Sequence, residues 1–171
     1  MRIYKISKSS YKLFNAQLLK EIEERGEVKL KINQDDEIEI TAVDEDKGGN
    51  EWIVEQVIKA IVYGFEPKHA FKLFDDQYFI ETIDLDAAFR KKEKDILRTK
   101  SRIIGEGGKA RKKLEELSGT NIMVSNATNN VSIIGPYIDL QNAKEAILKL
   151  AEGATHETVY RFLDSKREKV F

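Results

Sequence analysis

One stretch of this 171-residue chain decides its interpretation: Arg102-Ile103-Ile104-Gly105-Glu106-Gly107-Gly108-Lys109. Glycines permit a tight turn and, because they lack side chains, let another backbone approach the peptide closely. The start of the helix that follows offers backbone N–H groups and a positive dipole end to phosphate. The stretch is therefore typical of a G-x-x-G loop between two helices. A turn that is rich in glycine only for steric reasons is the alternative.

Two other glycine motifs fit the stretch less well. A P-loop requires glycine where Ile103 stands and Ser or Thr where Ala110 stands. The dinucleotide-binding pattern G-x-G-x-x-A is met by Gly105, Gly107 and Ala110, but it needs a strand before it and an acidic residue about 20 positions after it. A charged helical segment precedes the loop, and residues 123–130 contain no acid. The sequence therefore favours neither of these nucleotide-binding folds.

The charge of the chain is divided unequally. Overall, 29 basic and 30 acidic residues leave a net charge of -1. Residues 1–89 hold 12 basic and 19 acidic residues, whereas residues 90–171 hold 17 and 11. Within residues 90–113 alone, eleven basic residues stand against three acidic ones. This concentration beside the glycines predicts contact with a phosphate backbone, and a solvated helix face is the alternative for such a run.

The helix and strand patterns occur twice along the chain. In the first half they predict strands at 1–6, 28–32 and 38–41 and helices at 11–25, 52–63 and 67–74. In the second half they predict strands at 78–83, 122–124 and 131–134 and helices at 85–102, 109–117, 139–151 and 155–166. A shift of 89 residues places Ile58 on Ile147 and Gly64 on Gly153. We therefore expect two related units, 1–77 and 78–171, that pack together, the second with a C-terminal helical extension.

The loop and its surroundings resemble a KH domain of type I, with elements in the order β-α-α-β-β-α and a G-x-x-G loop that clamps about four nucleotides of single-stranded RNA. The resemblance implies an α+β fold of two tandem type I KH units, arranged as a pseudo-repeat. Two positions depart from the usual pattern: Glu106, where a basic residue is common, and Arg111, where an apolar one is usual. Residues 7–25 contain no glycine. The first unit is thus degenerate, and we expect it to pack on the second unit or to bind protein.

The candidate RNA-binding residues surround the loop of the second unit. Gly105, Gly107 and Gly108 are expected to form the turn, and Glu106 to set its local charge. Five basic side chains are expected to neutralise phosphate: Arg102, Lys109, Arg111, Lys112 and Lys113. Four apolar residues are candidates for the floor of the groove that holds the bases, and each could equally belong to the core: Ile103, Ile104, Ile122 and Val124.

A degenerate KH unit followed by one that carries the loop resembles the archaeal partner-of-Nob-one (dimethylase-interacting) family. The similarity rests on residues 101–109, on Lys-Leu-Glu-Glu-Leu at 113–117, on Ile133-Ile134-Gly135 followed by Asn142-Ala143-Lys144, and on Val159-Tyr160. It implies binding to the 3′ region of small-subunit (16S) ribosomal RNA during ribosome assembly and rRNA processing, beside a PIN-domain endonuclease. It also implies a contact with the alpha subunit of translation initiation factor two.

Two functional alternatives remain open. One is a protein-interaction adaptor in translation or RNA decay, in which the acidic first unit is the main binding surface. The other is a KH pair that acts on messenger RNA or in transcription. We expect no catalytic residue, cofactor or metal: the chain has no cysteine, its two histidines lack partners at ligand spacing, and its acidic pairs lie in predicted turns. No apolar run approaches the roughly 18 residues that span a bilayer, so we expect a cytoplasmic protein without a membrane partner.

Overall fold

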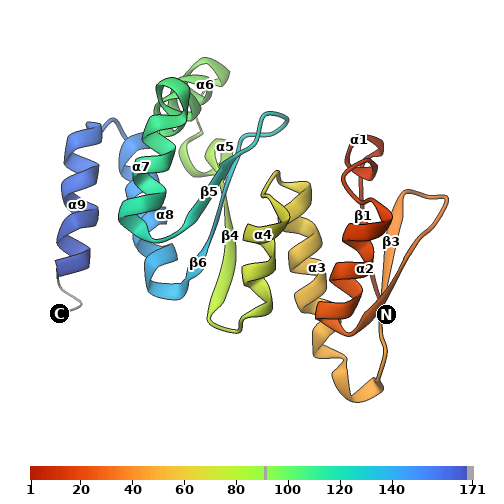
Figure 1. Ribbon diagram of the computed structural model, residues 1–171. Helices are drawn as coiled ribbons and strands as arrows, with labels where there is room; N and C mark the ends of the chain where they lie inside the picture. The colour runs from red at the N-terminus through yellow and green to blue at the C-terminus, as the bar shows by residue number, and fades with distance from the viewer. Residues whose placement is uncertain (91, 169–171) are drawn as a thin grey trace. The chain divides into compact units, whose positions relative to one another are not determined.

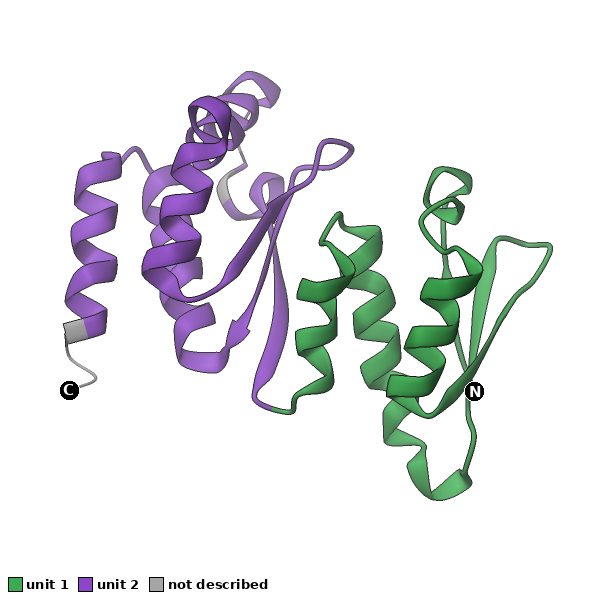
Figure 2. Ribbon diagram, viewed as in Figure 1, with its two compact units in different colours: residues 1–76 green, residues 77–171 purple. Residues whose placement is uncertain are grey.

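The computed structural model describes residues 1–90 and 92–168. The chain forms two compact units, Met1–Asp76 and Gln77–Phe171 (Figure 2). The boundary between them in the sequence lies one residue before the predicted one. Each unit contains a three-stranded antiparallel sheet and helices. The predicted α+β class is confirmed. Within the described residues, no helix is long and apolar enough to cross a membrane.

The first unit has the strand order β1-β3-β2 (Figure 1). The alternation of its strands buries Ile38 and Ile40 of the central strand, and the helices contribute Ile22 and Ile58 to the same core. Its elements are β1 (Arg2–Lys5), α1 (Lys8–Tyr11), α2 (Ala16–Gly26), β2 (Val28–Ile32), β3 (Glu37–Ala42), η1 (Glu45–Lys47), α3 (Gly49–Val62), α4 (Pro67–Ala70) and η2 (Phe71–Phe74).

The helix predicted at residues 11–25 is wrong in its first turn. Helix α1 ends at Tyr11, and α2 begins only at Ala16, because Asn15 caps it: the side chain of Asn15 accepts a hydrogen bond from the Leu18 N–H at 2.8 Å. Leu13 lies in the break and is 45% exposed. The break gives this unit the β-α-α-β-β-α order.

The second unit has the equivalent strand order, β4-β6-β5. Its elements are β4 (Tyr78–Asp84), α5 (Leu85–Phe89), α6 (Glu93–Ile104), η3 (Glu106–Gly108), α7 (Lys109–Ser118), β5 (Asn121–Val124), β6 (Asn130–Pro136), α8 (Tyr137–Ala151) and α9 (His156–Glu168). The helix predicted at 85–102 is divided, because Arg90 adopts a left-handed conformation with φ of 47° and ends α5. Helix and strand residues share one core, which includes Leu114, Ile133 and Ile147.

The two units also share the ending predicted from the 89-residue shift. Gly64 follows α3 and Gly153 follows α8, with φ of 108° and 106° respectively, and a further helix comes next in both units. In the second unit this further helix, α9, packs against α7 and α8 (Figure 1). The start of α9 therefore lies near the start of α7, where the glycine loop is.

Candidate nucleic-acid interface

The three glycines of the loop have different structural roles. Gly105, Gly107 and Gly108 all have positive φ, at 72°, 61° and 78°. A Cβ atom on Gly105 would lie 2.6 Å from the Cβ of Ala110 and 2.8 Å from its backbone nitrogen. A Cβ on Gly107 or Gly108 would meet no atom within 4 Å. Gly105 thus lets the loop close against α7, whereas the other two glycines leave a bare stretch of backbone on the surface.

The same loop leaves the N-terminus of α7 without a side-chain cap. Gly108 occupies the N-cap position, and no side chain there caps the helix. Helix α2 of the first unit, at the equivalent place, is capped by Asn15. The first N–H groups of a helix lack partners within it and carry the positive end of its dipole. In α7 the Lys109 N–H already donates to the backbone oxygen of Glu106, so the second unit can present the N–H groups that follow it to a phosphate, whereas α2 of the first unit has one such group bonded to Asn15.

The basic residues of α7 point to different sides of the helix, because successive residues are rotated by about 100°. Arg111 lies beside Glu115, with 3.9 Å between Arg111 Nε and Glu115 Oε1, and Glu115 also accepts a hydrogen bond from the Ile122 N–H of β5 at 2.9 Å. Lys109 and Lys113 instead line a hollow next to α9. Lys112 is exposed. Among residues 1–90 and 92–168, no ion pair involves any of these three lysines.

Arg102 was expected among the phosphate contacts, but its guanidinium is committed elsewhere. It donates hydrogen bonds to the backbone oxygen of Leu150 at 2.6 Å and to that of Ala154. The Nε2 atom of His156 lies 2.7 Å from the backbone oxygen of Arg102 and donates to it, since a carbonyl can only accept. Arg102 is therefore a positioning residue that fastens the end of α6, just before the loop, to the chain between α8 and α9.

The four apolar candidates divide between core and surface. Ile103, Ile122 and Val124 belong to the core, and at most 7% of each residue is exposed, so they have little surface to offer a base. Ile104 is only partly buried and packs on the outside of that core. Only Ile104 of the four thus remains available as a groove-floor residue.

One residue of this region was missed by the sequence patterns. Lys100 of α6 is 9% exposed, and its Nζ donates to the backbone oxygen of Thr128, in the loop between β5 and β6, at 2.8 Å. This bond links α6 to the β5–β6 loop. The signal was its position: Lys100 lies four residues after Ile96 and three before Ile103, which is the buried face of the helix.

In the part of the chain that the structure describes, the acidic residues and histidines do not gather into a metal site. Within the described ranges, no group of three or more His, Asp or Glu side chains lies close enough together to hold an ion. Asp35 is in the β2–β3 turn, where its N–H donates to the side chain of Asn33, as turn residues commonly do. His156 has the structural role described above.

Replacing Glu106 by Gln is expected to raise the affinity for single-stranded RNA about two- to threefold, because the exposed carboxylate repels phosphate across solvent. Fluorescence polarisation with a labelled oligonucleotide would measure the change. Glu116→Gln is the matched control, since Glu116 is an exposed acid on α7 outside the loop. Equal affinity of the two variants would show that Glu106 does not face the RNA.

The chain has relatives among known proteins. The family model for the second KH domain of PNO1, described as a eukaryotic type KH-domain (KH-domain type I), matches residues 79–168. A KH domain-containing protein of Methanocaldococcus jannaschii is 38% identical over 152 residues, which are 88% of this chain and 66% of that protein. The RNA-binding protein PNO1 of Oryzias latipes is 32% identical over 104 residues, 60% of this chain and 42% of that protein. The chain thus spans less than two thirds of either curated relative.

A solved structure extends the similarity over both units. A chain in the crystal structure of the a/eIF2alpha–aDim2p–rRNA complex from Pyrococcus horikoshii superposes with a TM-score of 0.86 and is 33% identical. The match covers 98% of this chain and 94% of that one. The likeness therefore includes the first, loop-less unit as well as the second.

Proposed function

Because this chain belongs to the PNO1/Dim2 family of KH proteins, we propose that its second unit binds single-stranded RNA in the 3′ region of small-subunit ribosomal RNA during ribosome assembly. It does so without catalysing a reaction. The observation that carries the proposal is the loop at residues 105–108: bare backbone at Gly107 and Gly108, followed by a helix start that no side chain caps. Lys109 and Lys112, both exposed, add positive charge beside it.

The protein partners follow from the same relationship. The solved complex from Pyrococcus horikoshii is described as containing initiation factor 2 alpha and rRNA together with aDim2p, so we propose the same two partners for this chain. A PIN-domain endonuclease, implied by the family resemblance, is a further proposed partner. The first unit suits a protein surface better than an RNA surface, because residues 1–76 hold 12 basic and 16 acidic residues, a net charge of -4, and α2 is capped by Asn15.

The rRNA assignment can be tested with two labelled oligonucleotides of equal composition. One has the 3′-terminal sequence of an archaeal 16S rRNA, and the other has the same bases in shuffled order. We expect tighter binding of the rRNA sequence in a polarisation assay. Equal affinity for the two would refute the rRNA target while leaving RNA binding intact. Failure of both to bind would refute RNA binding itself.

Arg102→Ala is expected to weaken RNA binding severalfold without changing its salt dependence. The substitution removes the donor to the Ala154 carbonyl and one of the donors to the Leu150 carbonyl, which still accepts from the Gly153 N–H at 3.1 Å, at a cost of about 1–3 kcal/mol in the free energy of unfolding. By contrast, Lys109→Ala removes a phosphate contact and should reduce the slope of log K against log salt by about 0.7. Binding titrations at four salt concentrations separate the two effects. A slope change in the Arg102 variant as large as that in the Lys109 variant would contradict the positioning role.

A further inference from the structure

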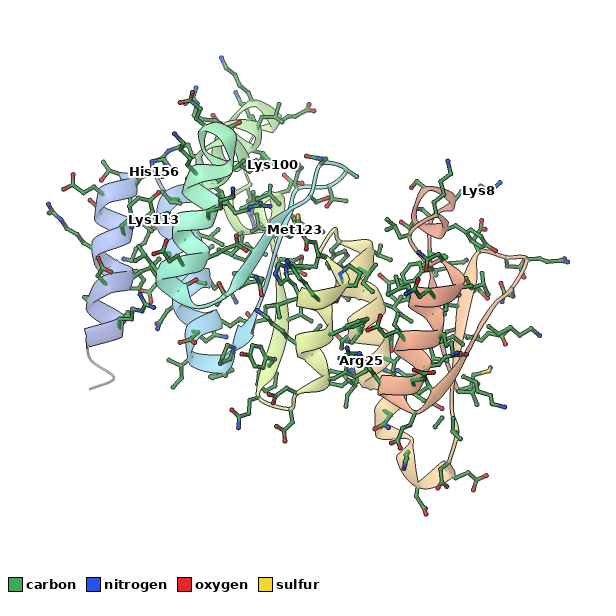
Figure 3. The ribbon with its side chains drawn as sticks, in the orientation of Figure 1. Lys8, Arg25, Lys100, Lys113, Met123 and His156 are labelled. Atoms are coloured by element: carbon green, nitrogen blue, oxygen red, sulfur yellow. The ribbon has the colours of Figure 1, made fainter. Side chains whose placement is uncertain are left out.

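A hollow of about 420 Å³ lies between the glycine loop and α9. It is lined by the loop at Gly105 and Glu106, by Lys109 and Lys113 of α7, and by His156 and Tyr160 of α9. We call it the α9 hollow. It lies on the side of α7 that faces α9, whereas Arg111 and Glu115 lie on the side that faces β5. Figure 3 shows Lys113 and His156 on these neighbouring helices.

The charge of the α9 hollow suits a single phosphodiester. Two lysines and one glutamate leave a formal charge of +1 when His156 is neutral. In the described part of the chain, neither lysine is taken up by an ion pair. His156 donates through Nε2 to the Arg102 carbonyl, so the other nitrogen of its neutral ring is an acceptor. Phosphate, and a hydroxyl or amino donor, would both find partners here.

The walls of the α9 hollow suit a flat ring. The Tyr160 side chain is half-buried, and its ring lies 6.1 Å from that of His156, centroid to centroid, at a tilt of 50°. Burial raises the pKa of the Tyr160 hydroxyl above its ordinary value. Aromatic rings bind the bases of single strands by stacking, with little dependence on sequence.

We propose that the α9 hollow is a second RNA subsite that takes one nucleotide of the strand, next to those held on the G-x-x-G loop. Lys109 and Lys113 hold its phosphate, and its base lies against Tyr160. This subsite rests on the proposed function, because the nucleotide enters as part of the strand that the loop clamps. The continuity is direct: the backbone of Gly105 lines the hollow, and Lys109 follows immediately after the bare backbone of Gly107 and Gly108.

A length series of oligonucleotides tests the subsite on the full chain. Oligomers of four to seven nucleotides are titrated against the wild type and against the variants Tyr160→Ala, Tyr160→Phe and Lys113→Gln. We expect the wild type to gain about tenfold in affinity at one length step beyond four nucleotides, a typical gain from one stacked base. Tyr160→Ala should lose that step and still bind the four-nucleotide oligomer as the wild type does. Lys113→Gln should also lose the step, and because it removes a positive charge near the loop it should weaken binding of the four-nucleotide oligomer by about two- to threefold. Tyr160→Phe, which retains the ring, should keep the step.

The control is Arg161→Ala. Arg161 follows Tyr160 on α9, is exposed and pairs with Glu157, outside the hollow, so its loss should leave the step unchanged. Tyr160 packs against the core, and Lys113→Gln carries the test if the alanine variant unfolds. Variants that keep the step, or that weaken all lengths equally, overturn the subsite. If no oligomer binds the wild type, the proposed function itself fails.

A free mononucleotide has the same chemistry as a nucleotide of the strand, and adenosine monophosphate distinguishes the two sources. If the hollow belongs to the RNA path, the mononucleotide should remove the length step by competition and leave four-nucleotide binding unchanged. Binding of the mononucleotide to a wild type that shows no length step would assign the hollow to a free nucleotide and overturn the proposal.

Discussion

Gly107→Asp is expected to lower the affinity for single-stranded RNA about 10- to 100-fold, since a new negative charge about 4–6 Å from a phosphate costs on the order of 1–3 kcal/mol at a protein surface. The fold should survive the substitution. Gly107 has φ of 61° and ψ of 19°, in the left-handed region that Asp and Asn tolerate best among residues with side chains. A Cβ atom there meets nothing within 4 Å. Binding should thus be lost while the melting temperature stays nearly constant.

Gly107→Asn is the matched control for this prediction. It has the same shape and backbone preference as the aspartate variant but no charge, so its loss of affinity should be much smaller. Polarisation titrations measure the affinities, and thermal unfolding by circular dichroism measures stability. Unchanged binding by the aspartate variant would refute the contact between loop and phosphate. It would favour the adaptor alternative, in which the acidic first unit is the main binding surface.

Gly105→Ala is expected to have the opposite effect to Gly107→Asp: its main consequence should be a loss of folding stability. Its φ of 72° and ψ of 175° lie in a region that is accessible essentially only to glycine, at a strain of about 1–3 kcal/mol for other residues. The added methyl would also lie 2.6 Å from the Cβ of Ala110 and 2.8 Å from its nitrogen. We expect about 2–4 kcal/mol of destabilisation, which lowers the melting temperature of a unit of this size by about 10–25 °C.

Gly108→Ala provides the comparison for Gly105→Ala. Gly108 also has positive φ, at 78°, but a Cβ atom there meets nothing within 4 Å, so only the backbone strain applies. At about 1 kcal/mol for that strain, its melting temperature should fall by about 4–8 °C, less than that of the Gly105→Ala variant. If the two alanine variants unfold at the same temperature, the close approach to Ala110 does not determine the stability of the loop.

Much of this fold could be predicted because its signals are local. The glycine loop, the alternation of the strands and the glycine stops after α3 and α8 are all readable within a few residues. The break before α2 also has a local signal, since Asn15 is a good N-cap, but the helical spacing of Leu13 and Phe14 relative to Leu18 favours one continuous helix. The broken helix therefore reflects two competing local signals and not an absent one.

The role of Arg102 could not be predicted in this way. Its hydrogen-bond partners are 48 and 52 residues away in the chain, and the histidine that binds its carbonyl is 54 residues away. A basic residue beside a phosphate loop and a basic residue that holds the loop from behind have the same sequence context. The isoleucines pose the same problem, because an apolar residue in a groove and one in the core differ only in what packs over them. Only the tertiary contacts distinguish these cases.

The hydrogen bond between His156 and the Arg102 carbonyl shows that the functional part of the second unit extends beyond α8. A module of three helices on a sheet would be complete at Ala151, the last residue of α8. Yet the segment that delivers the glycines to the RNA is held by groups supplied from Leu150, Ala154 and His156. The structural unit that positions the glycine loop therefore includes the sheet and its helices through α9. A protein partner that bound α9 on a face outside the α9 hollow would therefore act on the loop through these contacts and not by occupying the RNA site.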